Sequence, residues 1–353
     1  MENAETAAVL LKNYQSVFSS ETRSGRDALE RLWLYNDRTF PRDDPTPERT
    51  PSKAKRNILF RWQCTIGCNF ACSYCWQNEE RATAHKHCFD AFRAEKWLEA
   101  FDRHFGGGDR GVSLLLSGGE PTLDTKNMAF LLGELCRRSY IRNVRMDTNA
   151  SWARKSFETV KEKGKIWLNC SFHPDYFTLE RFVRRIGEYR AAGFNIGMVN
   201  FVVTKLNRGR FEELRAALNP DIPVNPNPLV SGEREYDAPT AAVFKQRLPS
   251  IDYRHKYEKA SPLGILCLFP AVAYCMDAYG TVIVGCHERD NNNFVTDPEL
   301  PPLFGGYSAC PKMICVGSDM YSFQKGCDRN LDLNPLFSYK KALLNQSNIK
   351  EMV

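Results

Sequence analysis

The chain has 353 residues, of which 43% are hydrophobic and 25% charged, which excludes a disordered or collagen-like protein. Its 48 Lys and Arg residues outnumber 42 Asp and Glu residues, but they are scattered along the chain, so the charge gives no support for a nucleic-acid partner. An uncharged apolar run long enough for a membrane helix is absent, and the N-terminus lacks the pattern of a secretory signal, so we expect a cytoplasmic protein.

Two sequence patterns divide the first two thirds of the chain. Residues 1–55 are expected to form an N-terminal helix at 27–36 and a linker rich in Pro and charge. From residue 57 onward, short apolar runs alternate with segments of helical periodicity. Strands are predicted at 57–62, 112–116, 144–146, 166–170, 196–203 and 222–224, and helices at 91–105, 126–138, 153–163, 178–192 and 209–218. Thr178 is placed to cap the helix at 178–192, and Gly193 to end it.

Six such β/α units predict an α/β fold with a parallel sheet over residues 56–230. The pattern alone fits either a partial (β/α)6 barrel of the TIM type or an open doubly wound sheet. In both, chemistry takes place at the carboxyl ends of the strands. Residues 231–265 are predicted to be a polar linker with one helix at 240–248, and residues 266–353 a small module with a hairpin at 274–278 and 281–284.

Cysteine is the most informative residue type in this sequence. The chain has 13 cysteines and no export signal, so ligation of metal or iron–sulfur clusters is favoured over structural disulfides. One group lies at 64–75 and a second at 267–327. We expect Cys88, Cys136 and Cys170, which stand apart, to be small buried residues.

The first group contains the spacing C-x3-C-x2-C at Cys68, Cys72 and Cys75, directly after the first predicted strand. Three thiolates on one loop can bind three irons of a [4Fe–4S] cluster and leave the fourth iron free for substrate or cofactor. Cys64 cannot begin the same pattern, because position 71 is Ala71. The alternative is a zinc site or buried thiols, although zinc usually takes paired C-x2-C ligands and a fourth residue.

This segment resembles the radical S-adenosylmethionine (radical SAM) enzymes, whose hallmark is C-x3-C-x-aromatic-C with Tyr74 in the aromatic position. The resemblance covers residues 56–230 and implies a partial (β/α)6 barrel. It also implies that the open iron chelates the amino and carboxylate groups of S-adenosylmethionine, which is then cleaved to a 5′-deoxyadenosyl radical.

Further positions after the predicted strands fit the same resemblance. Gly118, Gly119 and Glu120 are similar to the GGE sequence that holds the methionyl amine in this superfamily, and two glycines allow close approach of the backbone to a ligand. Asn149 and Ser171 are candidates for contacts to the ribose or carboxylate of the cofactor. Asn200 either faces the barrel interior or is a buried amide, and Asn225 and Asn227 are weaker candidates. His173 is either a substrate-facing acid or base, or a structural residue of an X-Pro turn.

The second cysteine group is similar to the Twitch and SPASM extensions of radical SAM enzymes. Cys267, Cys286, Cys310 and Cys315 are the favoured ligands of a second, auxiliary [4Fe–4S] cluster, and Cys327 could replace either of the last two. Cys275 falls within a strand and is expected to be a small buried residue. The alternative for the whole group is a zinc site or reduced thiols.

The sequence therefore predicts an oxidoreductase-type radical SAM enzyme that abstracts hydrogen from a peptide or another natural-product substrate. A peptide is slightly favoured because of the C-terminal cysteines, and a separate leader-peptide-binding protein would then assist. The alternatives are a small metabolite such as a sugar or nucleoside, or a non-catalytic iron–sulfur or zinc scaffold, against which Glu120 argues. An external flavodoxin or ferredoxin is expected to supply the electron.

Overall fold

The computed structural model describes residues 57–75, 77, 87–108, 110–229, 236–248, 257–258, 260–312, 315 and 323–324. The predicted helix at 27–36 lies outside these ranges, as does Cys327. Within them, six strands run parallel and in chain order: β1 (Asn57–Thr65), β2 (Gly111–Gly118), β3 (Ile141–Thr148), β4 (Ile166–Phe172), β5 (Asn195–Val202) and β6 (Val224–Asn227). A doubly wound sheet would reverse its strand order, so this order identifies a partial (β/α)6 barrel.

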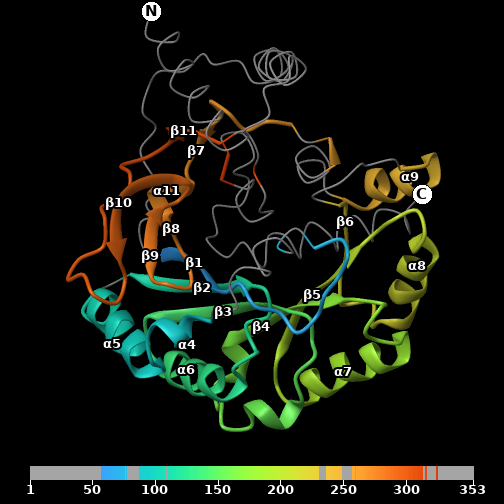
Figure 1. Ribbon diagram of the computed structural model, residues 1–353, viewed down its shortest axis with the longest axis horizontal. Coiled ribbons are helices and arrows are strands. Elements are labelled where there is room, and N and C mark those ends of the chain that lie inside the picture. The colour runs from blue at the N-terminus through green and yellow to red at the C-terminus, as the bar shows by residue number, and fades with distance from the viewer. Residues whose placement is uncertain are drawn as a thin grey trace, which may run out of the picture.

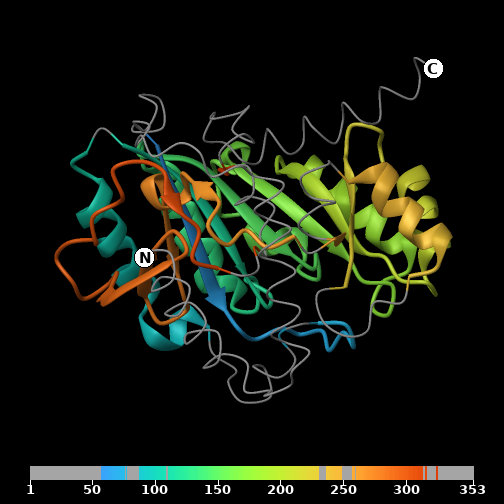
Figure 2. The ribbon, with the colours of Figure 1, turned by 90° about the horizontal axis from the view of Figure 1, so that it is seen from above.

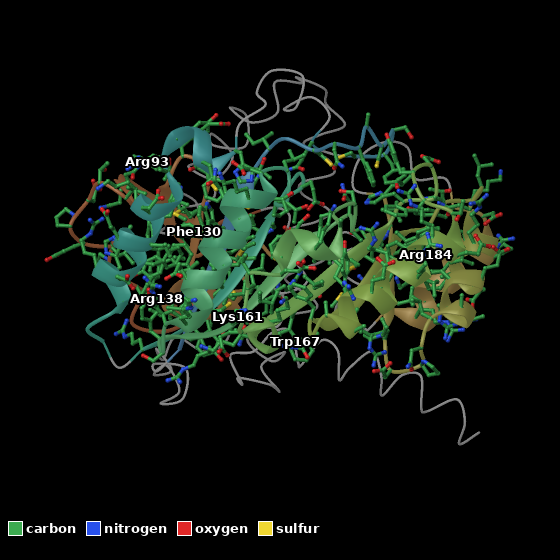
Figure 3. All side chains as sticks on the ribbon, turned by 90° about the horizontal axis from the view of Figure 1, so that it is seen from below. Arg93, Phe130, Arg138, Lys161, Trp167 and Arg184 are labelled. Carbon is green, nitrogen blue, oxygen red and sulfur yellow. The ribbon has the colours of Figure 1, made fainter. Side chains whose placement is uncertain are left out.

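Helices cover the outer side of this arc of strands (Figure 1). They are α4 (Cys88–Ala91), α5 (Ala94–Phe105), α6 (Thr125–Arg137), α7 (Leu179–Ala191) and α8 (Arg208–Ala217). Aromatic side chains fill the space between the two layers, with Phe60 against Phe101 at 5.5 Å and Trp62 against Trp97 at 4.5 Å between ring centroids. Polar side chains such as Arg184 of α7 extend from the outer surface of the helices (Figure 3).

The inner face of the sheet carries many more polar side chains than the helix-facing side. Side chains alternate along a strand, so Arg145 and Asp147 of β3 point away from the face that Val144 and Met146 bury among the helices. Arg145 Nε donates to Asp147 Oδ1 at 2.8 Å. Ser113, Asn143, Asn169 and Asn225 are also buried. The strands predicted from sequence as apolar therefore carry hydrogen-bonding groups on the concave side, beside apolar residues such as Leu59 and Leu115.

Most predicted elements are confirmed, with shifts at their ends. Thr178 caps α7 by accepting a hydrogen bond from Arg181 N, and Gly193 follows it with a φ of 94°. The helix predicted at 153–163 is wrong, because the segment forms only two 3₁₀ turns, Arg154–Phe157 and Lys163–Lys165. Only Phe157 and Val160 of this segment are buried, and two apolar residues three apart favour a tight turn over a long helix. The last strand lies at Val224–Asn227, downstream of its predicted position.

The C-terminal segment extends the barrel sheet. It follows α9 (Ala238–Arg247) and contains β7 (Leu266–Cys267), α11 (Phe269–Val272), β8 (Ala273–Met276), β9 (Thr281–Val284), β10 (His287–Asn293) and β11 (Ser308–Ala309). β8 pairs with β1 in parallel, with Leu59 opposite Ala273, and the predicted hairpin continues from it as β9. Figure 2 shows this segment at one end of the sheet and α8 and α9 at the other. None of the helices described here is long and apolar enough to cross a membrane.

Candidate active site at the carboxyl ends of the strands

The loop after β1 carries the three cysteines of the C-x3-C-x2-C pattern. Cys72 is buried, and Cys68 and Cys75 are partly buried. The other residues of the loop fix its course, since Phe70 stacks on Tyr176 with ring centroids 4.0 Å apart and Ala71 N donates to the Tyr176 hydroxyl at 2.6 Å. The loop therefore has supports of its own that do not depend on the thiols.

The donor set of this loop, three cysteine thiols, is one that can bind a [4Fe–4S] cluster. In a cubane, each thiolate would bind a different iron. N–H groups already face one of the sulfurs, because Phe70 N donates to Cys68 Sγ at 3.4 Å and Asn149 Nδ2 lies 3.7 Å from it. Such donors stabilise the charge of cluster thiolates.

Cys64 lies outside this group, in agreement with the spacing argument. It belongs to β1 rather than to the loop, is fully buried, and donates to Ser117 O at 3.4 Å. Burial and the nearby Glu120 raise the pKa of the Cys64 thiol. Cys88, Cys136 and Cys170 are also fully buried, which confirms the expectation that they pack as small core residues.

The glycines of the Gly118–Glu120 turn are required by the backbone of the cysteine loop. Gly118 has a φ of 129°, and a Cβ there would lie 2.0 Å from Thr65 O. A Cβ on Gly119 would lie 2.0 Å from Gly67 O. The two backbones are joined by hydrogen bonds from Gly119 N to Thr65 O at 3.0 Å and from Glu120 N to Gly67 O at 2.8 Å. In the structure, the close approach that these glycines allow is therefore to the protein's own backbone.

Glu120 is the centre of a buried hydrogen-bond network. Its carboxyl group has no exposed surface. Oε1 accepts from Thr122 N at 3.1 Å, Thr122 Oγ1 at 2.5 Å and Thr148 Oγ1 at 2.9 Å, and Oε2 accepts from Asn149 N at 2.6 Å. Burial raises the pKa of Glu120 above its ordinary value, although these hydrogen bonds act in the opposite direction. Glu120 therefore ties the end of β2 to the end of β3.

Replacement of Glu120 by Gln is expected to destabilise the apoprotein. Each carboxyl oxygen accepts a backbone N–H, from Thr122 and from Asn149, but the amide nitrogen of Gln can only donate. One buried donor would then face another, at a cost of about 1–3 kcal/mol. Thermal unfolding measures this as a loss of about 2–4 °C per kcal/mol for a domain of 150–250 residues.

A suitable control for this prediction is Glu134→Gln, because Glu134 pairs with Arg137 and Arg138 on the protein surface. Surface changes of this kind usually stay within about 0.5 kcal/mol. If Glu120→Gln melts at the wild-type temperature, the hydrogen-bond network does not stabilise the fold, and the carboxyl group is free to act on a ligand alone.

Asn149 connects this network to the cysteine loop. Its Nδ2 donates to Asn69 Oδ1 at 2.8 Å, and its Oδ1 accepts from Ser151 N at 3.0 Å. Asn69 Nδ2 in turn donates to Ser151 Oγ at 3.0 Å. The structure thus brings Glu120 and Asn149 together beside Cys68. Sequence reasoning missed Asn69 and Thr148, although each is directly adjacent to a residue that it had selected, Cys68 and Asn149 respectively.

Tyr74 and His173 also face each other across the cysteine loop. The Tyr74 hydroxyl lies 2.9 Å from His173 Nδ1, and Cys72 Sγ lies 3.3 Å from the same nitrogen. Burial lowers the pKa of His173 to about 4, so the ring is neutral near neutral pH. Burial and the neighbouring Cys72 raise the pKa of Tyr74. In this structure, His173 Nδ1 is directed at the cysteine loop.

Ser171 and Asn200 lie farther along the inner face of the sheet. Ser171 of β4 is opposite Asn200 of β5, which is opposite Asn225 of β6. Asn225 Nδ2 donates to Asn200 Oδ1 at 2.8 Å and to Asn227 Oδ1 at 3.1 Å. Asn200 therefore belongs to a cluster of three amides, and the structure favours the interior-facing interpretation over that of an amide bonded to backbone.

Four of the five described cysteines of the C-terminal group belong to, or pack against, one small apolar cluster. Cys267 is part of it, and Cys275, Cys286 and Cys315 pack against it together with Phe304 and Tyr307. Burial is the main cause that raises the pKa of Cys286, that of Cys310 to about 11 and that of Cys275 to about 12, and Cys286 contributes to the last two values.

Cys310 is placed by the backbone of the short sheet formed by β7 and β11. Its N–H donates to Ile265 O, and its carbonyl accepts from Gly264 N, both at 2.9 Å. Arg61 of β1 lowers the pKa of Cys275 and of Cys286, against the larger effect of burial. The charge of Arg61 would favour the thiolate form that a metal requires.

Comparison with known proteins gives one family and several structures of low similarity. Residues 62–218 match the model of the radical SAM superfamily. A solved structure of native anSMEcpe with bound AdoMet is 14% identical, covers 69% of this chain and 79% of its own, and has a TM-score of 0.49. Streptococcus suis SuiB is 14% identical, with 69% and 64% covered and a TM-score of 0.46. BtrN in complex with AdoMet and 2-DOIA is 12% identical, with 83% and 89% covered and a TM-score of 0.31.

None of the curated proteins matches the chain in sequence. The family model spans the part of the barrel from β1 to the end of α8, which contains the cysteine loop, the Gly118–Glu120 turn and the ends of β3 and β4. On this match, residues 62–218 form a radical SAM domain, the domain of enzymes that use S-adenosylmethionine.

Proposed function

We propose that Cys68, Cys72 and Cys75 bind three irons of a [4Fe–4S] cluster, whose fourth iron holds the amino and carboxylate groups of S-adenosylmethionine. The observation that supports this most is the backbone contact between the cysteine loop and the Gly118–Glu120 turn, in which Gly119 N donates to Thr65 O at 3.0 Å. This contact supports the proposal, because it joins the start of the cysteine loop to the turn.

When bound, the cluster supplies an electron, delivered by a flavodoxin or ferredoxin, that cleaves S-adenosylmethionine to a 5′-deoxyadenosyl radical for hydrogen abstraction. The chain's own residues are proposed to bind and orient S-adenosylmethionine. The turn at Gly118, Gly119 and Glu120 is proposed to lie against the methionyl amine. The carboxyl group of Glu120, which would face this amine, already accepts four hydrogen bonds from the protein. Asn149, Ser171 and Asn200 are proposed to contact the rest of the cofactor.

We propose that the C-terminal segment binds an auxiliary [4Fe–4S] cluster through Cys267, Cys286, Cys310 and Cys315. Its support is the apolar cluster that contains Cys267 and is lined by Cys286 and Cys315. Leu59 of β1 belongs to the same cluster, so the site would adjoin the barrel interior. A second cluster there would accept an electron from a substrate radical or anchor the substrate, which favours a peptide over a smaller molecule.

A small hydroxyl-rich metabolite such as a sugar or nucleoside is the second candidate substrate. The amides of Asn200, Asn225 and Asn227 on the inner face favour it, because they offer both donors and acceptors without a net charge. With a peptide substrate, a separate leader-binding protein is the partner that we propose.

The proposed function is tested with the anaerobically reconstituted wild-type protein. With dithionite and S-adenosylmethionine, we expect 5′-deoxyadenosine, measured by liquid chromatography and mass spectrometry. Deuterated peptides and deuterated sugars or nucleosides then distinguish the substrates, because abstraction transfers deuterium to 5′-deoxyadenosine. An iron-loaded protein that forms no 5′-deoxyadenosine under any of these conditions would contradict the proposal.

A further inference from the structure

His173 occupies a position behind the cluster loop that its sequence context did not predict. It follows β4, and its ring lies parallel to that of Tyr74, at 7° with centroids 6.1 Å apart, and edge-on to Phe70 at 5.6 Å. Nδ1 is 2.9 Å from the Tyr74 hydroxyl and 3.3 Å from Cys72 Sγ. Tyr74 and Cys72, both of the cysteine pattern, thus lie within hydrogen-bond distance of the same nitrogen of His173.

A single ring nitrogen can serve these two neighbours in only two ways. With a proton on Nδ1, it donates to the sulfur of Cys72, to the oxygen of Tyr74, or to both. Without that proton, it accepts from the Tyr74 hydroxyl or from the thiol of a metal-free Cys72, and it cannot donate to sulfur. A cysteine bound to iron is a thiolate, which only accepts hydrogen bonds. The arrangement in which Nδ1 carries the proton is therefore the one that suits a loaded cluster.

We propose that His173 is a positioning residue of the cluster loop that donates its Nδ1–H to Cys72 Sγ, shares this donor with Tyr74, and thereby raises the reduction potential of the cluster. This inference rests on the proposed ligand role of Cys72. A hydrogen bond to a cluster sulfur withdraws electron density and stabilises the reduced state, so its removal makes the potential more negative. Tyr74 competes for the same hydrogen, so its hydroxyl has the opposite effect.

Three variants separate this role from simple packing. His173→Phe keeps a ring against Tyr74 and Phe70 but removes Nδ1. His173→Asn removes the ring but places a side-chain N–H close to the position of Nδ1. Tyr74→Phe keeps the second ring and removes the hydroxyl that competes with Cys72. The midpoint potential of each reconstituted protein is measured by a redox titration followed by electron paramagnetic resonance, using the signal that changes on addition of S-adenosylmethionine.

We expect a midpoint potential more negative than that of the wild type in His173→Phe, close to it in His173→Asn, and more positive in Tyr74→Phe. His104→Phe is a matched control, because His104 bonds Phe294 O on the outer side of the barrel. It should leave the potential unchanged. Iron and sulfide are measured in every variant, so a loss of cluster is not mistaken for a shift.

The possible failures of this inference are distinct from those of the proposed function. If the wild type itself holds no cluster that responds to S-adenosylmethionine, the proposed function is wrong. If the wild type is loaded, equal potentials in wild type, His173→Phe and Tyr74→Phe overturn the role of His173. If His173→Phe and Tyr74→Phe both fail to load a cluster, the pair serves assembly of the loop, and the proposed effect on the potential is likewise overturned.

Discussion

A variant in which Cys68, Cys72 and Cys75 are all changed to Ala is expected to lose about four irons per chain and all formation of 5′-deoxyadenosine. The loop should keep its course in this variant, because the contacts of Phe70 and Ala71 with Tyr176 do not involve the thiols. Iron and sulfide analysis after anaerobic reconstitution, together with product detection under dithionite, measures both effects in the same sample.

Cys64→Ala is the matched control for the triple variant, because Cys64 lies only four positions before the first proposed ligand. Its thiol is buried and bonded to Ser117 O, on a strand rather than on the loop. This variant should keep its iron and its activity. Reductive cleavage of S-adenosylmethionine by the triple variant would show that the electron does not come from a cluster on this loop.

The sequence predicted the barrel well where a single physical signal dominates. Apolar runs separated by amphipathic segments located five of the six parallel strands, and Thr178 and Gly193 marked the ends of α7. The choice between barrel and doubly wound sheet needed the strand order, because periodicity reports which residues are buried but not which strands are neighbours. The pairing of β8 with β1 is a long-range contact of the same kind.

The sequence selected residues for the candidate site but did not predict how their side chains are oriented. Spacing selected the three cysteines, and their place after β1 followed from the fold. The role of Gly118 and Gly119 was harder, since nothing local shows that Thr65 O and Gly67 O would meet them. From the sequence alone, Glu120 is expected to have a carboxylate that is available to a ligand. Its four donors come partly from Thr148 and Asn149, which lie on another strand end.

His173 shows the same limit. Its position after β4 predicted a side chain at the mouth of the barrel, but the direction of the ring depends on Tyr74, which lies 99 positions away in the chain. The sequence left the choice between a substrate-facing acid or base and a structural residue open. The distances of its Nδ1 from Tyr74 and Cys72 favour a residue that acts through the cluster loop.

The triple variant also allows the metal bound by the C-terminal cysteines to be measured separately from the first cluster. In that background, anaerobic reconstitution is expected to leave about four irons and four sulfides per chain if an auxiliary cubane is present. A zinc site would leave one Zn²⁺ per chain and no absorption from sulfide-to-iron charge transfer. A variant that holds neither metal would mean that the cysteines near β7 and β9 bind none, and the preference for a peptide substrate would lose its main support.

Single substitutions in the triple variant then test the proposed ligands. Cys315→Ala should remove the residual cluster, because the auxiliary site would lose one of the four thiolates that are proposed to hold it. Cys275→Ala is the control from within the same apolar cluster, since Cys275 packs beside Cys286 but lies within β8. It should retain iron. Both residues pack against this apolar cluster, so a difference between the two variants reports ligation rather than loss of packing. Loss of iron in Cys275→Ala with retention in Cys315→Ala would instead identify the strand cysteine as the ligand.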